Sequence, residues 1–282
     1  MIDLETRELR YFVAVAEELH FGRAAARLGI AQPPLSRAVQ QLERRLGVTL
    51  LDRDRRGVRL TGAGRVLLTE GRAALDATGA AARRARRAAA PRDHLVLAAK
   101  AGAHHELLRK LLDAIAAEPD APEVEMLLCG MGESQRALRD GRADAALLVR
   151  PFDAMAGFDT EDLGVEQQMV VLPAGHPLAQ RKSLTVAEVS DLPDLPMARW
   201  PGPDGRYPAG PGPEVGDQAQ LAQLIALGRA LVIICESARA WMWSAHAAVP
   251  LTDAPPVASV LAWPPHSRSR AVARLIEIAT GR

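Results

Sequence analysis

The sequence of 282 residues has few cysteines, few aromatic residues and no long apolar run. Its two cysteines, Cys129 and Cys235, exclude a disulfide framework, so we expect a reducing compartment, the cytoplasm. No apolar stretch approaches the roughly 18 residues of a membrane-spanning helix. Charges within the first few residues argue against a signal peptide. These features predict a cytoplasmic protein without a membrane partner.

Recognisable catalytic patterns are also missing. The sequence contains no nucleophile with a base and an orienting residue at a known spacing, no phosphate-binding loop and no paired-carboxylate signature. The run His104-His105-Glu106 offers metal-ligating side chains, but adjacent residues on a helix do not face one site. We therefore expect no catalytic residues, no metal and no cofactor, and predict that the protein is not an enzyme.

Charge is distributed unevenly along the chain. Residues 1–92 contain 18 arginines, no lysine and 10 acidic residues, which gives this segment a net charge of about +8. The remaining residues carry about −7, and the whole chain +1. A basic segment followed by an acidic one is typical of a polyanion-binding module joined to a domain that does not touch the polyanion.

The basic segment has the pattern of a winged helix-turn-helix. Apolar residues at helical spacing predict a helix over residues 6–19, and Ala24, Ala25 and Leu28 a second, short one that turns at Gly29. A third helix is expected from Gln32, with two prolines in its first turn, to Gly47. Residues 49–51 and 58–60 read as two strands joined by a charged wing. Such a module places the third helix in the major groove of duplex DNA.

A long helix should follow, with Thr61 as its N-cap and Pro91 as its stop. Because a helix of nearly thirty residues rich in alanine and arginine cannot bury itself in a small domain, we expect it to pair with a second copy as a dimer. Beyond it, strands and helices alternate, which predicts a parallel α/β sheet. The domains are expected at 1–60, 61–91 and 92–282, the last with one lobe at about 92–150 plus 257–282 and another at about 151–256.

The first 64 residues resemble the LysR-type transcriptional regulators. The resemblance rests on Leu9, Phe12, Ala16, Phe21, Ala24, Ala25, Leu28, Gln32, Pro33, Ser36, Leu42, Glu43, Leu46, Gly47, Leu50, Arg53, Thr61 and Gly64. It implies an α/β protein with an N-terminal all-α winged helix-turn-helix and a C-terminal two-lobed domain similar to periplasmic binding proteins. It also implies homodimers or homotetramers that switch transcription when a small molecule binds. Where the family usually has Ser or Thr, this chain has Ala31, and so lacks a hydroxyl that caps the third helix.

The expected DNA contacts come from the third helix, the wing and the helix before the turn. The amide of Gln32 suits adenine or a phosphate, and arginines suit phosphates or the minor groove. The alternative is a solvated polar face, which the order of helix, turn, helix and wing disfavours. The predicted contacts are Arg23, Gln32, Pro33, Ser36, Arg37, Gln40, Arg53, Arg55 and Arg56.

In a two-lobed α/β domain a ligand binds between the lobes, near strand carboxyl ends and helix N-termini. Free N–H groups there favour an anionic or carbonyl oxygen, although ordinary turns explain the glycines equally well. The predicted effector site comprises Lys100, Ala101, Gly102, Cys129, Gly130, Met131, Arg199, Trp200, Gly216 and Asp217. Two alternatives stay open: a redox sensor that uses Cys129 and Cys235, and an enzyme of the same architecture.

Overall fold

The computed structural model describes residues 4–54, 57–89, 93–202, 206–265 and 267–281. The chain divides into two compact units, one comprising Met1–Arg84 with Arg139–Gly141 and the other comprising Ala85–Leu138 with Arg142–Arg282. No helix of the described residues is both long enough and apolar enough to cross a bilayer.

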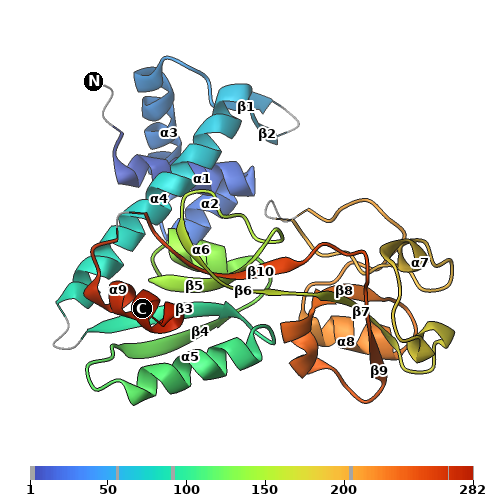
Figure 1. The fold of residues 1–282 in the computed structure, drawn as a ribbon. Helices are drawn as coiled ribbons and strands as arrows, with labels where there is room; N and C mark the ends of the chain where they lie inside the picture. The colour runs from blue at the N-terminus through green and yellow to red at the C-terminus, as the bar shows by residue number, and fades with distance from the viewer. Residues whose placement is uncertain (1–3, 55–56, 90–92, 203–205, 266, 282) are drawn as a thin grey trace. The chain divides into compact units, whose positions relative to one another are not determined.

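The first unit contains three short helices, a hairpin and a long helix (Figure 1). Its elements are α1 (Thr6–Glu18), α2 (Phe21–Leu28), α3 (Gln32–Leu46), β1 (Leu51–Asp54), β2 (Gly57–Leu60) and α4 (Gly62–Ala88). Phe12, Leu35, Leu42 and Leu50 are buried in one core, against which Leu67, Leu68 and Leu75 of α4 pack. The predicted helices are confirmed, but the first strand begins at Leu51, two residues later than expected, and runs to Asp54.

Local capping fixes where these helices begin and end. Gly29 and Gly47 close α2 and α3 in the left-handed conformation, with φ of 66° and 68°. The hydroxyl of Thr61 accepts a hydrogen bond from Gly64 N–H at 3.0 Å, as predicted for the N-cap of the long helix. Ala31 provides no side-chain cap to α3, as its missing hydroxyl predicts. The expected stop at Pro91 lies outside the described residues.

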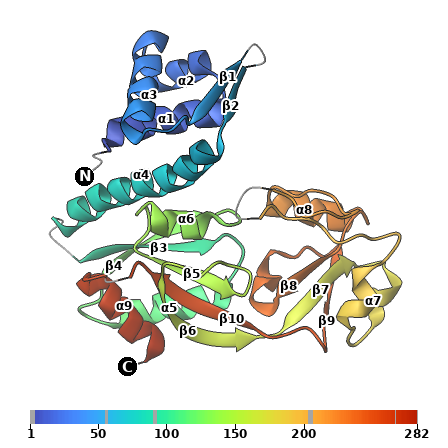
Figure 2. The same ribbon diagram turned by 90° about the horizontal axis from the view of Figure 1, so that it is seen from above.

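The second unit contains two lobes. The first lobe is built on a five-stranded sheet of order β4-β3-β5-β10-β6. Helices α5 and α9 lie on one side of this sheet and α6 on the other (Figure 2). Its elements are β3 (His94–Lys100), α5 (His105–Ala117), β4 (Glu123–Cys129), α6 (Glu133–Arg139), β5 (Ala145–Arg150), β6 (Asp159–Glu166), β10 (Val257–Trp263) and α9 (Arg270–Thr280).

The second lobe is built on a smaller sheet of order β8-β7-β9. Helix α7 packs with one core cluster and α8 with another, so the sheet has apolar side chains on both faces. Its elements are β7 (Gln168–Pro173), the 3-10 helix η1 (Pro177–Gln180), α7 (Val186–Ser190), α8 (Gln218–Ala226), β8 (Val232–Cys235), the 3-10 helix η2 (Glu236–Trp241) and β9 (His246–Pro250).

Strands β3, β4 and β5 pair parallel, as the alternation of strands and helices predicts, while β10 returns antiparallel to both β5 and β6 and makes the sheet mixed. Two other expectations about these sheets are wrong. Strand β6 falls within residues 151–256, expected for the second lobe, yet pairs in the sheet of the first. Its polar sequence resembles a loop because it is an edge strand with little apolar alternation. Residues 197–200 form only isolated bridges, since Met197 and Arg199 each pair at a single position.

Candidate DNA interface and effector site

Helix α3 separates its side chains into a buried row and an exposed row. Leu35, Val39 and Leu42 are buried against α1 and α2. The opposite face presents Gln32, Pro33, Arg37 and Gln40 to solvent, while Ser36 is half-buried. Because residues four apart lie on one side of a helix, Gln32, Ser36 and Gln40 form a continuous polar row. The structure thus brings the predicted residues of α3 together on one face.

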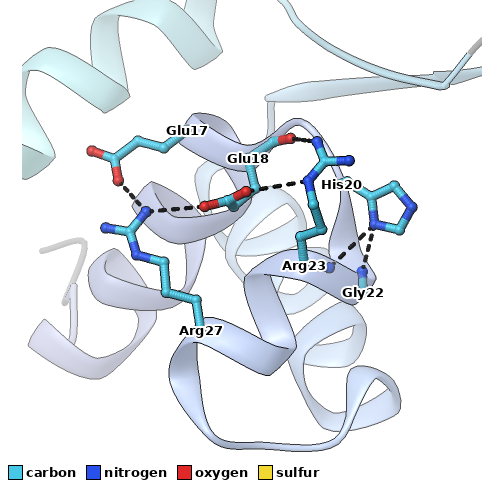
Figure 3. Close-up of polar contacts among 6 residues, drawn as sticks. All are labelled: Glu17, Glu18, His20, Gly22, Arg23 and Arg27. Atoms are coloured by element: carbon cyan, nitrogen blue, oxygen red, sulfur yellow. Dashed lines mark hydrogen bonds and ion pairs between the residues drawn. The ribbon is translucent and has the colours of Figure 1, made fainter.

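The N-terminus of α3 lies beside the N-terminus of α2. A Cβ atom added at Gly22 would lie 3.0 Å from the His20 ring and 3.7 Å from Oε1 of Gln32. The Nδ1 atom of His20 accepts hydrogen bonds from the N–H groups of Gly22 at 3.1 Å and Arg23 at 3.2 Å (Figure 3). His20 therefore caps the N-terminus of α2. The sequence did not predict this role, because histidine is not among the preferred N-cap residues.

Arg23 and Arg53, two of the predicted phosphate contacts, interact with neighbouring residues of the DNA-binding unit. The guanidinium of Arg23 donates to the backbone oxygen of Glu18 and lies 3.3 Å from its carboxylate (Figure 3). The guanidinium of Arg53 lies 4.5 Å from the centre of the Phe21 ring and 3.6 Å from the Glu43 carboxylate. Arg53 thereby ties the wing to α2 and α3. Arg55 and Arg56 lie outside the described residues.

A carboxylate that the sequence analysis did not single out joins three helices of this unit. Glu17 of α1 lies 2.7 Å from the guanidinium of Arg27 on α2 and 2.7 Å from that of Arg72 on α4. All three side chains line a cavity of about 210 Å³. Burial raises the pKa of Glu17, but the hydrogen bonds and charges of Arg72 and Arg27 outweigh it and hold the pKa below its usual value.

In the second unit, Lys100 and Trp200 meet at the junction of the two lobes. Lys100 ends β3 of the first lobe, and its ammonium lies 5.6 Å from the ring centre of Trp200 in the second lobe. Burial lowers the pKa of Lys100, while Cys235 and Asp153 act in the opposite direction. The junction thus contains a partly desolvated cation against an aromatic face.

Asp153 supplies an acid near this cation. Its two carboxylate oxygens accept hydrogen bonds from Gln135 Nε2 and from the Val149 N–H, each at 2.8 Å. Burial raises the pKa of Asp153, although these hydrogen bonds and Lys100 oppose the rise. No sequence motif marks Asp153, because it lies in a turn that follows β5.

Further polar contacts also join the two lobes. The Gln218 amide, oriented to satisfy both groups, donates to Ala101 O at 2.8 Å and accepts from Trp241 Nε1 at 2.9 Å. Gly102 beneath it has a φ of 75°, which favours glycine, and a Cβ atom there would also displace the Gln218 amide, 2.4 Å away.

A second set of contacts runs through buried side chains. The Ser259 hydroxyl donates to Glu166 at 2.8 Å and lies 3.2 Å from Nδ1 of His104. The Glu166 carboxylate also accepts from the Ser237 N–H at 2.6 Å. Tertiary folding assembles this network from four distant segments, so no sequence spacing signals it.

Several predicted effector groups are already engaged. Arg199 donates to Gly212 O at 2.6 Å and Pro208 O at 2.7 Å, and pairs with Glu214 at 3.2 Å. The Gly130 N–H donates to Glu133, and the Gly216 N–H to Gln220. These contacts stabilise the turns in which the predicted groups lie.

Other predicted members of the effector site have structural roles here. The Asp217 carboxylate caps α8, where it accepts from the Gln220 N–H at 2.8 Å. Cys129 is buried in the core beneath α6, and Met131 follows it in the turn before that helix.

Comparisons with known proteins identify both units. Residues 6–65 match the family model described as a bacterial regulatory helix-turn-helix protein of the lysR family, and residues 88–282 match the LysR substrate binding domain. The chain belongs to the LysR family. It is a DNA-binding transcriptional regulator with an effector-binding domain, and the family is one of regulators rather than enzymes.

Individual relatives agree with this assignment. The chain is 32% identical to the uncharacterized regulator YnfL of Escherichia coli, over 98% of both chains. It is 36% identical to the regulator AlsR of Bacillus subtilis, over 70% of this chain and 66% of AlsR, just under two thirds of that protein. The crystal structure of CbnR with its target DNA has 24% identity, 99% coverage of both chains and a TM-score of 0.62, which shows a shared fold.

Proposed function

We propose that the exposed face of α3 and the β1–β2 wing read operator DNA, and that a small molecule at the lobe junction controls transcription. The first part rests on the polar row of Gln32, Ser36 and Gln40, in which both glutamines are exposed and Ser36 is half-buried, opposite the buried row of Leu35, Val39 and Leu42. A rigid helix with this division presents amide and hydroxyl groups to base edges while its core side fixes their orientation.

The proposed assembly follows from α4. This helix runs for 27 residues, and most of its side chains after Leu75 are exposed, which leaves a face free to pack against a second copy. We propose a DNA-binding domain at 1–60, a dimerisation helix at 61–91 and an effector domain at 92–282, assembled as homodimers or homotetramers. We further propose that the protein acts in the cytoplasm and has no catalytic activity of its own.

The DNA face is tested with the full chain and a binding site enriched from a random DNA pool. We expect Gln32→Ala to weaken specific binding by about 5- to 150-fold, because a good bidentate contact to a base contributes about 1–3 kcal/mol of discrimination. Binding to unrelated DNA should change little. Fluorescence anisotropy measures both affinities.

The matched control is Gln223→Ala, which removes an exposed glutamine from α8. It should leave both affinities unchanged. Equal specific binding by wild type and Gln32→Ala would remove Gln32 from the proposed interface.

The effector position is tested independently of ligand charge. Small molecules that raise the melting temperature of the full chain are selected, and amide hydrogen exchange then locates them. We expect protection around residues 97–104 and 198–200, which flank Lys100 and Trp200. Protection confined to the DNA-binding unit would contradict the proposed position.

The thiol alternative receives less support. Cys129 and Cys235 form no disulfide and belong to different core clusters. Desolvation on burial raises the pKa of the Cys235 thiol and thus disfavours the thiolate, the nucleophile that attacks peroxide. Similarity to Corynebacterium glutamicum OxyR, at 26% identity and a TM-score of 0.53, keeps the test worthwhile. We expect peroxide treatment to change the DNA affinity of neither the wild type nor Cys235→Ser.

A further inference from the structure

We propose that His20 is a further DNA contact, whose Nε2–H donates a hydrogen bond to a backbone phosphate beside the base that Gln32 reads. This inference rests on the proposed DNA interface and adds one residue and one phosphate contact to it. Three features of the DNA-binding unit support it: the proton on the His20 ring, the place of this ring beside Gln32, and the pairing of the other polar groups around it.

The His20 ring carries its proton on Nε2. Its Nδ1 accepts hydrogen bonds from the backbone N–H groups of Gly22 and Arg23, at 3.1 and 3.2 Å. A ring nitrogen that carries a proton cannot accept, so the ring is neutral and its proton lies on the other nitrogen. His20 is exposed, and within the ranges that the structure describes no group accepts from this Nε2–H. The ring therefore presents an oriented donor to solvent.

This donor lies beside the first residue of the recognition helix. A Cβ atom at Gly22 would lie 3.0 Å from Cε1 of His20, the ring carbon between the two nitrogens, and 3.7 Å from Oε1 of Gln32. The His20 ring and the Gln32 amide thus border the same small space. In a helix-turn-helix, the helix before the recognition helix crosses the DNA backbone, and here that helix is α2, which His20 caps. Phosphate contacts at this place fix the register in which α3 meets the bases.

The other polar groups at this end of α2 are already paired. The N–H groups of Gly22 and Arg23 are bonded to Nδ1, so the end of the helix does not offer them to a phosphate. The guanidinium of Arg23 contacts the backbone oxygen and the carboxylate of Glu18 (Figure 3). Among these groups, the Nε2–H of His20 is the donor that remains. Neutral side chains donate to phosphate oxygens as arginine and lysine do.

A neutral donor differs from an arginine in its response to salt. It adds a hydrogen bond to a charged oxygen but, without a charge of its own, releases no counterion from the DNA. Loss of the His20 contact should therefore weaken binding to all sequences alike and leave the dependence of affinity on salt unchanged. Loss of an arginine from a phosphate reduces that dependence.

Two variants separate the cap of α2 from the DNA contact. His20→Ser keeps a preferred N-cap residue but removes the distal donor, whereas His20→Ala removes both. His105→Ser, which removes an exposed histidine from α5, is the control. In urea unfolding of the full chain, His20→Ser and His105→Ser should be at least as stable as wild type, and His20→Ala less stable.

The experiment measures binding of the full chain to the enriched operator, to unrelated DNA, and to operators in which one phosphate at a time is replaced by a neutral methylphosphonate. We expect His20→Ser to weaken binding to both DNAs by about tenfold, with the salt dependence of wild type. Replacement of one particular phosphate should weaken wild type similarly but have little further effect on His20→Ser, because both changes remove the same hydrogen bond. His105→Ser should match wild type at every phosphate.

The inference is overturned if His20→Ser binds DNA like wild type, if its loss is restricted to the operator, if its salt dependence falls by one contact, or if its effect adds to that of every replaced phosphate. The last comparison also decides the case of an unstable His20→Ser, because partial unfolding would weaken binding to all the replaced operators equally. Lost specificity in Gln32→Ala with unchanged binding by His20→Ser preserves the proposed function and refutes only the phosphate contact. An operator bound equally by wild type and Gln32→Ala refutes the proposed base contact separately.

Discussion

Gly62 and Gly64 stand two residues apart in the first turn of α4, but only Gly64 lies against backbone atoms. A Cβ atom at Gly64 would lie 2.1 Å from the backbone oxygen of Leu50, whereas one at Gly62 would meet nothing within 4 Å. The close approach lets Thr61 and α4 pack on the segment that precedes the wing. Gly64 is therefore required by packing rather than by backbone conformation.

We predict that Gly64→Ala destabilises the DNA-binding unit by about 1–3 kcal/mol, because backbone must move to admit the methyl group. Gly62→Ala is the control and should be neutral or up to about 1 kcal/mol more stable, since alanine favours a helix. Urea unfolding of the full chain, followed by circular dichroism, measures both. A Gly64→Ala variant as stable as wild type would show that the packing of α4 relaxes freely.

At the scale of elements, Glu17 joins three helices through two arginines. The carboxylate on α1 pairs with Arg27 of α2 and Arg72 of α4, although both arginines are about half exposed. Exposed pairs contribute little singly because water screens them. The two pairs that share the Glu17 carboxylate contribute more to stability than fully exposed pairs, because the Glu17 side chain is only 21% exposed. Its lowered pKa means that the ionised form stabilises the folded unit.

We predict that Glu17→Gln lowers the free energy of unfolding by about 0.5–1 kcal/mol at neutral pH, discounted for the exposure of the arginines. A lowered pKa gives stability that is present above the unfolded pKa, near 4.5, and is lost as the pH falls through the folded pKa. The free energies of unfolding of wild type and Glu17→Gln should therefore converge at acid pH. Glu70→Gln, at an exposed position on α4, is the control and should match wild type at every pH. A constant difference down to acid pH would contradict the charge explanation.

At the scale of the whole molecule, charge separates along the chain. Residues 1–92 carry about +8 and the rest about −7, so the near-neutral total conceals a strongly basic segment. Affinity of a basic module for DNA falls with salt because bound counterions are released from the phosphates. The slope of affinity against salt thus counts the phosphate contacts, whichever residues read bases.

We predict that Arg37→Ala reduces this slope by about one contact and weakens binding to all sequences alike, because an arginine on a phosphate carries no base information. Arg109→Ala removes an exposed arginine from the acidic segment and should leave the slope unchanged. Anisotropy titrations between about 50 and 200 mM salt measure the slope. A loss restricted to the specific site would mean that Arg37 reads a base instead.

The DNA-binding unit could be predicted closely because its signals are local. Periodic apolar residues, the turn glycines and the Thr61 cap act within one or two helical turns, and the structure confirms each. The effector domain was predicted less well. Strand β6 depends on pairing with β10, nearly a hundred residues away, and its own residues carry little apolar alternation. The partners of Arg199 likewise come from a loop that no periodic pattern describes.

The sequence alone determined the helices of the winged helix-turn-helix and the polar face of α3, since these follow from short-range periodicity and capping, and its resemblance to the LysR-type regulators supplied the family and the two-lobed architecture. Only the tertiary structure decided which charged groups remain available. Arg23, Arg53 and Arg199 are bound by neighbours that folding brings to them, while Lys100 is left facing Trp200. The physical reason is that residue type determines which charge a side chain carries, whereas the partner that neutralises it comes from distant segments of the chain.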